Sequence, residues 1–222
     1  MPSTDFSRTL PATPPSDTPI LHAQAWRFAY PGRLLLRDWS ACIRPGVSLV
    51  LGGDGAGKTT LLRLLAGALA PQAGSARLLG LPLPPWRSPG APHVFWVEPR
   101  SSGLDAVTPA QWFAQLPALY PRWDGEALAL HVRGFDLLPH LHKPMEQLST
   151  GTHRKVLFAA GFACGAELTL FDEPVAGLDR PSIHHLKAAL AGCAGQGARA
   201  LVVAHYEPLP GVPWRDTWVL PD

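Results

Sequence analysis

Residues 52–60 read GGDGAGKTT, the most informative segment of the chain. It fits the pattern G-x-x-x-x-G-K-[ST], which forms a phosphate-binding loop. Glycines let the backbone curl so that successive N–H groups point at one anion. We expect Lys58 to contact the β- and γ-phosphates of a nucleotide, and the hydroxyl of Thr59 to reach Mg²⁺. The predicted nucleotide-binding residues of the loop are Gly52, Gly53, Asp54, Gly55, Ala56, Gly57, Lys58, Thr59 and Thr60.

The sequence on either side of the loop supports this interpretation. Residues 47–51 (VSLVL) are mostly apolar or β-branched, as in a buried strand, and residues 61–67 (LLRLLAG) combine helix formers with a closing glycine. The positive end of that helix dipole would face the phosphates. An ordinary glycine-rich turn is the alternative, but it does not account for a strand before the loop and a helix after it.

Composition limits what the chain can be. Its 222 residues, 46% of them hydrophobic, suit one domain with a sizeable core, or a domain with a subdomain. The net charge of +2 gives no indication of nucleic-acid binding. We expect the three cysteines, Cys42, Cys164 and Cys193, to be reduced thiols, because they fit no metal-ligand spacing. Neither a membrane-spanning stretch nor a secretory signal is predicted.

The order of predicted elements indicates an α/β domain over residues 20–222. Residues 1–19 contain five prolines and are expected to form a disordered tail. Strands are expected at 20–29, 34–43, 47–51, 75–79, 94–97, 168–171, 198–204 and 217–220, with a proline-rich loop at 80–92. Helices are expected after Lys58 and at 109–119, 124–132, 149–163 and 182–194. Strands that alternate with helices are typical of a mainly parallel sheet, and a helical block at about 105–165 interrupts the alternation as an inserted subdomain.

Two carboxylates follow one predicted buried strand. Asp172 and Glu173 come directly after the apolar run that ends at residue 171. Ligands of parallel sheets bind just beyond the carboxyl ends of the strands, so we expect both side chains beside the phosphate loop. Asp172 would hold Mg²⁺ directly or through water, and Glu173 would act as the general base for hydrolysis. A solvated strand end is the alternative, and the nearby phosphate loop makes it the weaker one.

A histidine and a helix start offer two further site candidates. His205 ends another buried strand, where its imidazole would reach the γ-phosphate or the attacking water, although a structural histidine is the alternative. Ser149 and Gly151 open the helix at 149–163, and a helix start is both a capping site and an anion site. We expect this helix start to lie too far away to reach the phosphate loop of its own chain.

Five motifs in order make the chain resemble the ATP-binding cassette (ABC) ATPase family. They are GGDGAGKTT at 52–60, LSTGTHRK at 148–155, LTLFDEP at 168–174, VAGLD at 175–179 and VVAH at 202–205. The resemblance implies a phosphate-loop NTPase with a mainly parallel core, an N-terminal antiparallel β part and an inserted helical subdomain. It also implies ATP and Mg²⁺ as ligands, and a head-to-tail dimer that encloses two ATP molecules.

In such a dimer, each phosphate loop would face the partner's Ser149 and the partner's Gly151. The resemblance places Asp179 at the dimer contact near the opposing site. It also matches Tyr30 with the aromatic that stacks on adenine, whereas a simple turn aromatic is the alternative for this residue.

The chain departs from the family pattern at four positions. Glu98 stands where the family usually has a glutamine that touches Mg²⁺ and the water, and we count it as a candidate for both roles. Asp54 replaces an asparagine of the loop, and Thr150 and Thr152 replace a glycine and a glutamine of the signature. Both acidic residues add negative charge near the phosphates. The hydrolytic residues are nevertheless complete, so we expect an active ATPase: Lys58, Thr59, Asp172, Glu173 and His205.

The favoured function is the ATPase subunit of a membrane transporter. The resemblance implies that a separate transmembrane permease docks in a groove beside Glu98 and the inserted helices, and that the subunit lies on the inner face of the cell membrane. Residues 119–124 (LYPRWD) resemble exporters of the ABC-2 class, and haem- or cytochrome-assembly exporters are an alternative subtype. The alternatives to a transporter are a soluble cassette ATPase and a weakly hydrolysing regulator. The pattern leaves open the substrate, the direction of transport, and pairing as a homodimer or with a related cassette.

We predict that the wild-type protein hydrolyses ATP more slowly, or depends more strongly on Mg²⁺, than a Glu98→Gln variant. The reason is that the carboxylate repels the phosphates unless a cation compensates. Steady-state hydrolysis titrated with Mg²⁺ measures the difference, and identical titrations would contradict it.

Overall fold

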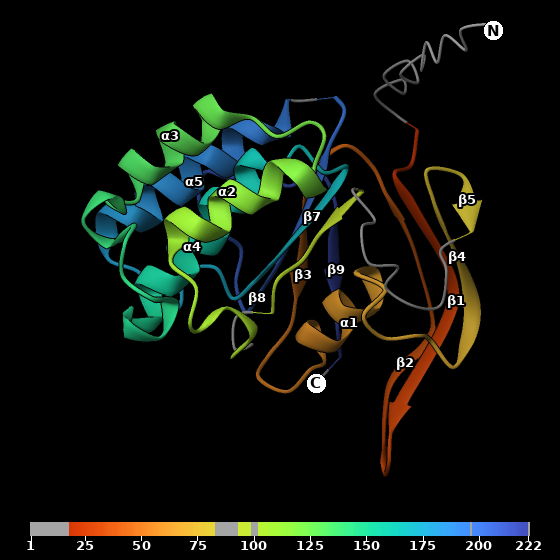
Figure 1. Ribbon diagram of the computed structural model, residues 1–222. Coiled ribbons are helices and arrows are strands. Elements are labelled where there is room, and N and C mark those ends of the chain that lie inside the picture. Colours follow the sequence, from red (N-terminus) through yellow and green to blue (C-terminus); the bar gives the residue numbers. More distant parts are fainter. Residues whose placement is uncertain (1–17, 83–92, 99–101, 196, 222) are drawn as a thin grey trace, which may run out of the picture.

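Two β-sheets and a block of helices make up the described part of the chain, which is residues 18–82, 93–98, 102–195 and 197–221 of a computed structural model. The parallel sheet stands in the middle, with the antiparallel sheet on one side and the helical block on the other (Figure 1). Almost all of the expected N-terminal tail, and most of the expected proline-rich loop at 80–92, lie outside the described residues.

The antiparallel sheet has the strand order β2-β1-β4-β5. Its strands are β1 (Leu21–Tyr30), β2 (Arg33–Ile43), β4 (Ala73–Leu78) and β5 (Leu81–Pro82). Trp26 is fully buried beneath this sheet, and its indole N–H donates to the carbonyl of Ser75 at 2.9 Å. The start of the expected loop at 80–92 is therefore corrected: residues 81–82 pair antiparallel with β4.

The parallel sheet has the order β6-β7-β8-β3-β9 and carries the predicted site. Its strands are β3 (Gly46–Leu51), β6 (Val94–Phe95), β7 (Leu168–Asp172), β8 (Ala200–His205) and β9 (Thr217–Val219). β7 and β8 are buried along their whole length, as expected for strands covered on both faces. The strand expected at 94–97 is shorter, because only Val94 and Phe95 pair with β7.

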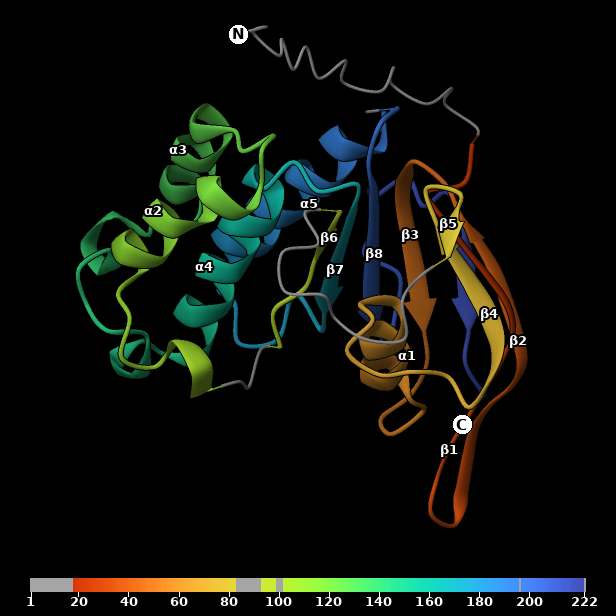
Figure 2. The same cartoon turned by 45° about the vertical axis from the view of Figure 1, so that its right-hand side comes forward.

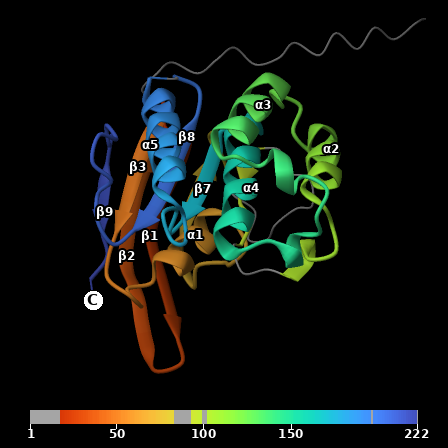
Figure 3. The same cartoon turned by 90° about the vertical axis from the view of Figure 1, so that its left-hand side faces the viewer.

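Five helices complete the described part of the fold, namely α1 (Lys58–Leu65), α2 (Pro109–Leu119), α3 (Gly125–Gly134), α4 (Thr150–Ala163) and α5 (Arg180–Ala194). Short 3₁₀ turns lie at Ser102–Leu104, Leu138–His140 and Met145–Gln147. Figure 2 shows α2, α3 and α4 gathered on the side of β6 and β7, away from the antiparallel sheet. Figure 3 shows α5 running alongside β3 and β8.

Side-chain caps explain where most of these helices begin. Thr108, Asp124 and Ser149 each accept hydrogen bonds from backbone N–H groups at the start of α2, α3 and α4. α5 begins two residues earlier than the sequence pattern predicts. Asp179 caps it, and Pro181 fits the first turn, where its missing N–H costs nothing.

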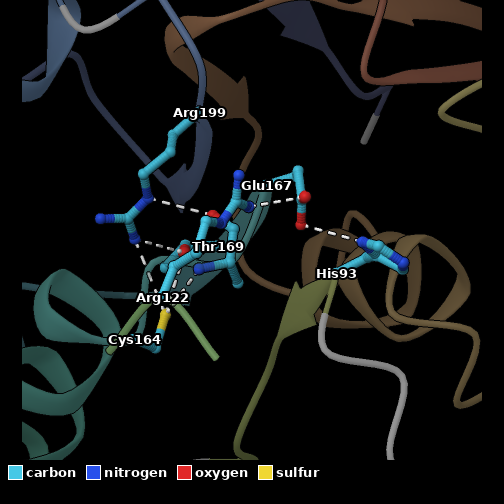
Figure 4. Close-up of polar contacts among 7 residues, drawn as sticks. His93, Arg122, Cys164, Glu167, Thr169 and Arg199 are labelled. Carbon is cyan, nitrogen blue, oxygen red and sulfur yellow. Dashed lines mark hydrogen bonds and ion pairs between the residues drawn. The ribbon is translucent and has the colours of Figure 1, made fainter. Parts of the chain in front are cut away.

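A polar cluster lies at the amino-terminal ends of β7 and β8, the edge opposite the phosphate loop (Figure 4). Arg199, just before β8, donates to the hydroxyl of Thr169 on β7 at 3.1 Å. It also donates to two backbone carbonyls in the last turn of α4, those of Gly161 (2.8 Å) and Phe162 (2.9 Å), and to that of Ala166 (3.0 Å) in the segment that follows. Glu167, just before β7, pairs with Arg122 at 2.6 Å. The cluster therefore joins the helical block to the parallel sheet.

Two histidines form a second contact between the helical block and the core. His131 on α3 stacks on Phe162 with ring centroids 4.6 Å apart, and its Nδ1 lies 3.0 Å from Nε2 of His185 on α5. They line a pocket of about 580 Å³. Burial, and then the charges of His185 and Arg199, lower the pKa of His131 from 6.5 to about 4. Its imidazole is therefore neutral at pH 7.

We predict that His131 makes the protein sensitive to acid. Its folded-state pKa lies below the unfolded value, so protonation favours unfolding and stability falls as the pH drops from about 6.5 toward 4. The loss should reach about 1–2 kcal/mol at pH 5. Thermal melts from pH 7 to pH 5 should show a smaller loss for His131→Gln than for the wild type. The control His22→Gln, on an exposed position of β1, should follow the wild type. A parallel decline of all three proteins would contradict this.

Candidate nucleotide-binding and hydrolysis site

The phosphate loop runs from the end of β3 to the start of α1, as predicted. Gly55 and Gly57 adopt φ values of 80° and 98°, which side chains with a Cβ rarely adopt. Gly52 packs so closely on Ala56 that an added Cβ would lie 2.9 Å from the Ala56 Cβ. Gly57 caps α1 with no side-chain hydrogen bond, so the first N–H groups of α1 are left for an anion.

The ammonium of Lys58 lies under this loop. Its Nζ donates to the carbonyls of Gly52 and Gly53, both at 2.8 Å, and forms an ion pair with Oε1 of Glu173 at 3.0 Å. The Lys58 side chain is buried, and its three oxygen contacts fix the position of the ammonium group. The predicted phosphate-binding cation and the predicted general base therefore lie in direct contact.

Thr59 and Asp172 supply the oxygens of a candidate metal site. The Thr59 hydroxyl donates to Oδ2 of Asp172 at 2.6 Å. Oδ1 of Asp172 is buried and has no hydrogen-bond partner among the described residues. Burial raises the pKa of Asp172, and the hydrogen bond from Thr59 opposes that rise. A buried carboxylate with one free oxygen beside a hydroxyl fits a hard cation such as Mg²⁺.

The predicted catalytic pair is also assembled. Nδ1 of His205 lies 2.8 Å from Oε2 of Glu173, and the imidazole is fully buried. Glu173 has a φ of 45°, a conformation that non-glycine residues adopt at a cost and that clusters at functional sites. Arg154 on α4 donates to the backbone carbonyl of Glu173 and so helps to fix this turn. The arrangement orients the carboxylate between Lys58 and His205.

Tyr30 lies at the edge of the loop. Its hydroxyl is 3.5 Å from Oγ1 of Thr60, its ring packs edge-on against Phe28 at 5.1 Å, and 41% of the residue is exposed. An exposed aromatic beside the phosphate loop suits a base-stacking role, which stays a prediction.

The residues expected at a dimer contact make contacts within their own chain. Ser149 caps α4 by accepting from the N–H of Thr152 at 3.1 Å. Gly151 faces the carbonyl of Gly177 so closely that no Cβ would fit. Asp179 caps α5 and pairs with Lys155 at 2.5 Å, and this hydrogen bond lowers the pKa of Asp179. None of these described contacts reaches residues 52–60, so a role opposite a partner's loop stays a prediction.

Only Glu98 of the two unusual carboxylates has a cationic partner among the described residues. Glu98 pairs with Arg63 on α1. Asp54 is exposed, and the Arg33 guanidinium lies 3.5 Å from where a Cβ on the adjacent Gly55 would be. The sequence analysis missed Arg33, Arg63 and Arg154. Of these three, only Arg63 could have been placed near the site from the sequence, because it lies one helical turn after Thr59 on the same face of α1.

Together, the fold and this site define a phosphate-loop nucleoside triphosphatase with an inserted helical block. The family model described as "ABC transporter" matches residues 36–176. "Cytochrome c biogenesis ATP-binding export protein CcmA" of Pseudomonas savastanoi pv. phaseolicola (strain 1448A / Race 6) is 35% identical over 191 residues, which cover 85% of this chain and 89% of the relative. The protein of the same name from Gluconobacter oxydans (strain 621H) is 31% identical over 199 residues, covering 89% and 86%.

A solved structure shares the fold as well. It is titled as a putative ABC transporter ATP-binding protein from Pyrococcus furiosus, with a TM-score of 0.72, 21% identity and coverage of 90% of this chain and 96% of that one. The chain thus belongs to the ABC transporter ATP-binding family. It is the ATP-binding and ATP-hydrolysing subunit of a transporter, and subunits of this family work with a transmembrane permease. No helix in the described part of the chain is both long and apolar enough to span a bilayer.

We predict that Asp172→Asn stabilises the protein at neutral pH in the absence of Mg²⁺. The folded-state pKa of Asp172 is raised above its ordinary 3.8, so the ionised carboxylate costs stability once the pH exceeds that folded value. The melting temperature of Asp172→Asn should exceed that of the wild type at pH 7.5, and the difference should shrink as the pH falls toward 4. The exposed control Glu146→Gln should show no such trend, and a constant difference across pH would contradict the prediction.

Proposed function

We propose that this chain powers an exporter of the type named by its cytochrome c biogenesis relatives, and that it does so as a head-to-tail dimer. The contact of Lys58 and His205 with the two oxygens of Glu173 carries the proposal, because it brings a phosphate-binding cation and a polarised carboxylate to one sheet edge. The similarity to the export proteins supports the export direction. The proposed location is the inner face of the cell membrane, on a permease.

The residues at the site fit bound Mg²⁺·ATP. The loop and Lys58 would bind the phosphates, and Thr59 and Asp172 would hold the ion. Among the described residues no three His, Cys, Asp or Glu side chains cluster as metal ligands, so phosphate oxygens and water would complete the shell, as Mg²⁺ prefers. The bound ion would offset the negative charge of the phosphates.

Glu173 and His205 would perform the proton chemistry. Glu173 would accept a proton from the attacking water, a role worth about 10²–10⁴ in rate. His205 would orient that carboxylate through Nδ1. Its Nε2 is buried without a described hydrogen-bond partner, and in a neutral ring that donates from Nδ1 it would accept a hydrogen bond, for example from the attacking water. A regulator without turnover would need this set to be incomplete or misaligned, and the described contacts favour neither. A soluble cassette ATPase would share the same set, and the similarity to the export proteins supports the transporter subunit over it.

We predict that Glu173→Gln loses ATP turnover by about 10²–10⁴-fold while ATP binding remains, because only the proton acceptor is removed. Mg·ATP should then shift the variant to a dimer in size-exclusion chromatography with light scattering, whereas Mg·ADP should not. A Glu173→Gln protein that turns over ATP normally, or that stays monomeric with Mg·ATP, would contradict the proposal.

We further predict that two inactive variants complement each other. Lys58→Ala removes the phosphate cation, and Ser149→Arg blocks the helix start that would seal the partner's site. In a mixed head-to-tail dimer, one of the two sites is built entirely from intact parts. An equal mixture should therefore regain up to about a quarter of the wild-type sites by random pairing. Hydrolysis that stays at the level of the separate variants would show that Ser149 does not act across a dimer.

A further inference from the structure

One face of α1 makes two consecutive contacts with the carboxyl edge of the parallel sheet. Thr59 and Arg63 are four residues apart and so lie above one another on this face. The first donates to Asp172 at 2.6 Å, and the second pairs with Glu98. Glu98 follows β6 by three residues, just as Asp172 follows the position on β7 that pairs with the last residue of β6. Asp172 therefore ends β7, and Glu98 lies in the segment that follows the neighbouring strand β6.

The Arg63 guanidinium also meets the nucleotide side of the loop. Glu98 raises the pKa of Arg63, and the Tyr30 hydroxyl adds to that effect; the same hydroxyl lies 3.5 Å from Oγ1 of Thr60. Arg63 thus lies between the predicted base-stacking residue and Glu98. Arg63 and Glu98 are about one third exposed each, so the ion pair is accessible to solvent but shielded on its inner side.

We propose that Arg63 is a positioning residue that holds the Glu98 carboxylate away from the triphosphate and cancels its charge. The Arg63–Glu98 ion pair then stands, without net charge, after β6 at the place where the family usually has a neutral glutamine. The inference rests on the ATP site proposed above. It limits the earlier prediction that the Glu98 carboxylate repels the phosphates. The full repulsion would appear only when Arg63 is removed.

The alternative is that Arg63 and Glu98 act independently, each through its own long-range charge. Independent charges predict that removing Arg63 weakens ATP binding by the same factor whether residue 98 is Glu or Gln. A holding role predicts a large loss with Glu98 and a small one with Gln, because only a freed carboxylate can turn toward the phosphates.

The test is a double-mutant cycle on ATP affinity, measured by calorimetry in EDTA with the full chain. Arg63→Gln should weaken ATP binding about tenfold in the Glu98 background and less than about threefold in the Glu98→Gln background. Arg63→Lys keeps the charge and should stay within about threefold of the wild type. Arg77→Gln, an exposed arginine on β4 with the same change in net charge, is the matched control and should leave affinity unchanged.

A second readout separates holding from a simple loss of structure. A freed Glu98 should make ATP binding depend more on Mg²⁺, so the ratio of the affinities with and without Mg²⁺ should rise in Arg63→Gln and return to the wild-type value in the double variant. Equal losses in the two backgrounds would overturn the inference and leave the ATPase intact. Failure of the wild type to bind ATP in either condition would overturn the proposed site as well.

Discussion

The hydrogen bond from the Thr59 hydroxyl to the Asp172 carboxylate is the contact on which the site depends. It ties the phosphate loop and α1 to β7, an inner strand of a sheet whose strands all end at the same edge. Because β3, β7 and β8 are parallel neighbours, the residues that follow them converge without any further constraint. The buried position of Asp172 makes its negative charge unfavourable until a cation is beside it.

Further contacts join the ends of the neighbouring strands at this edge of the sheet. Glu173 adopts a left-handed backbone conformation and lies between the Lys58 ammonium and the His205 imidazole. Such strain persists only where surrounding contacts hold it, and Arg154 supplies one of them from α4. The helical block therefore contributes to the shape of the candidate site as well as to its own packing.

The sequence predicted the parts of this protein that depend on local chemistry. The phosphate loop requires glycines with left-handed backbone angles. The helix starts follow from capping residues such as Thr108 and Ser149. The fully apolar runs before Asp172 and His205 identify buried strands, and the parallel arrangement then brings their ends together. Five ordered motifs made the family recognisable before any contact was known.

Contacts between distant segments were not predictable in the same way. No local pattern relates Arg63 to Glu98, His131 to His185, or Arg199 to the end of α4, because each pair meets only after the sheet and the helices pack. The shortened β6 and the earlier start of α5 have the same origin. A strand ends where its neighbour stops pairing, and a helix begins where a cap is available.

The Arg199 cluster fixes only one end of α4, the end far from Ser149. A helix of 14 residues is about 20 Å long, so α4 can be regarded as a lever whose pivot lies at the guanidinium of Arg199. A turn of about 10° around that pivot would sweep Ser149 through an arc of about 3–4 Å. Such a turn would also have to carry along the close contact of Gly151 with Gly177 and the Lys155–Asp179 pair, so a displacement of this tip would be passed on to the start of α5.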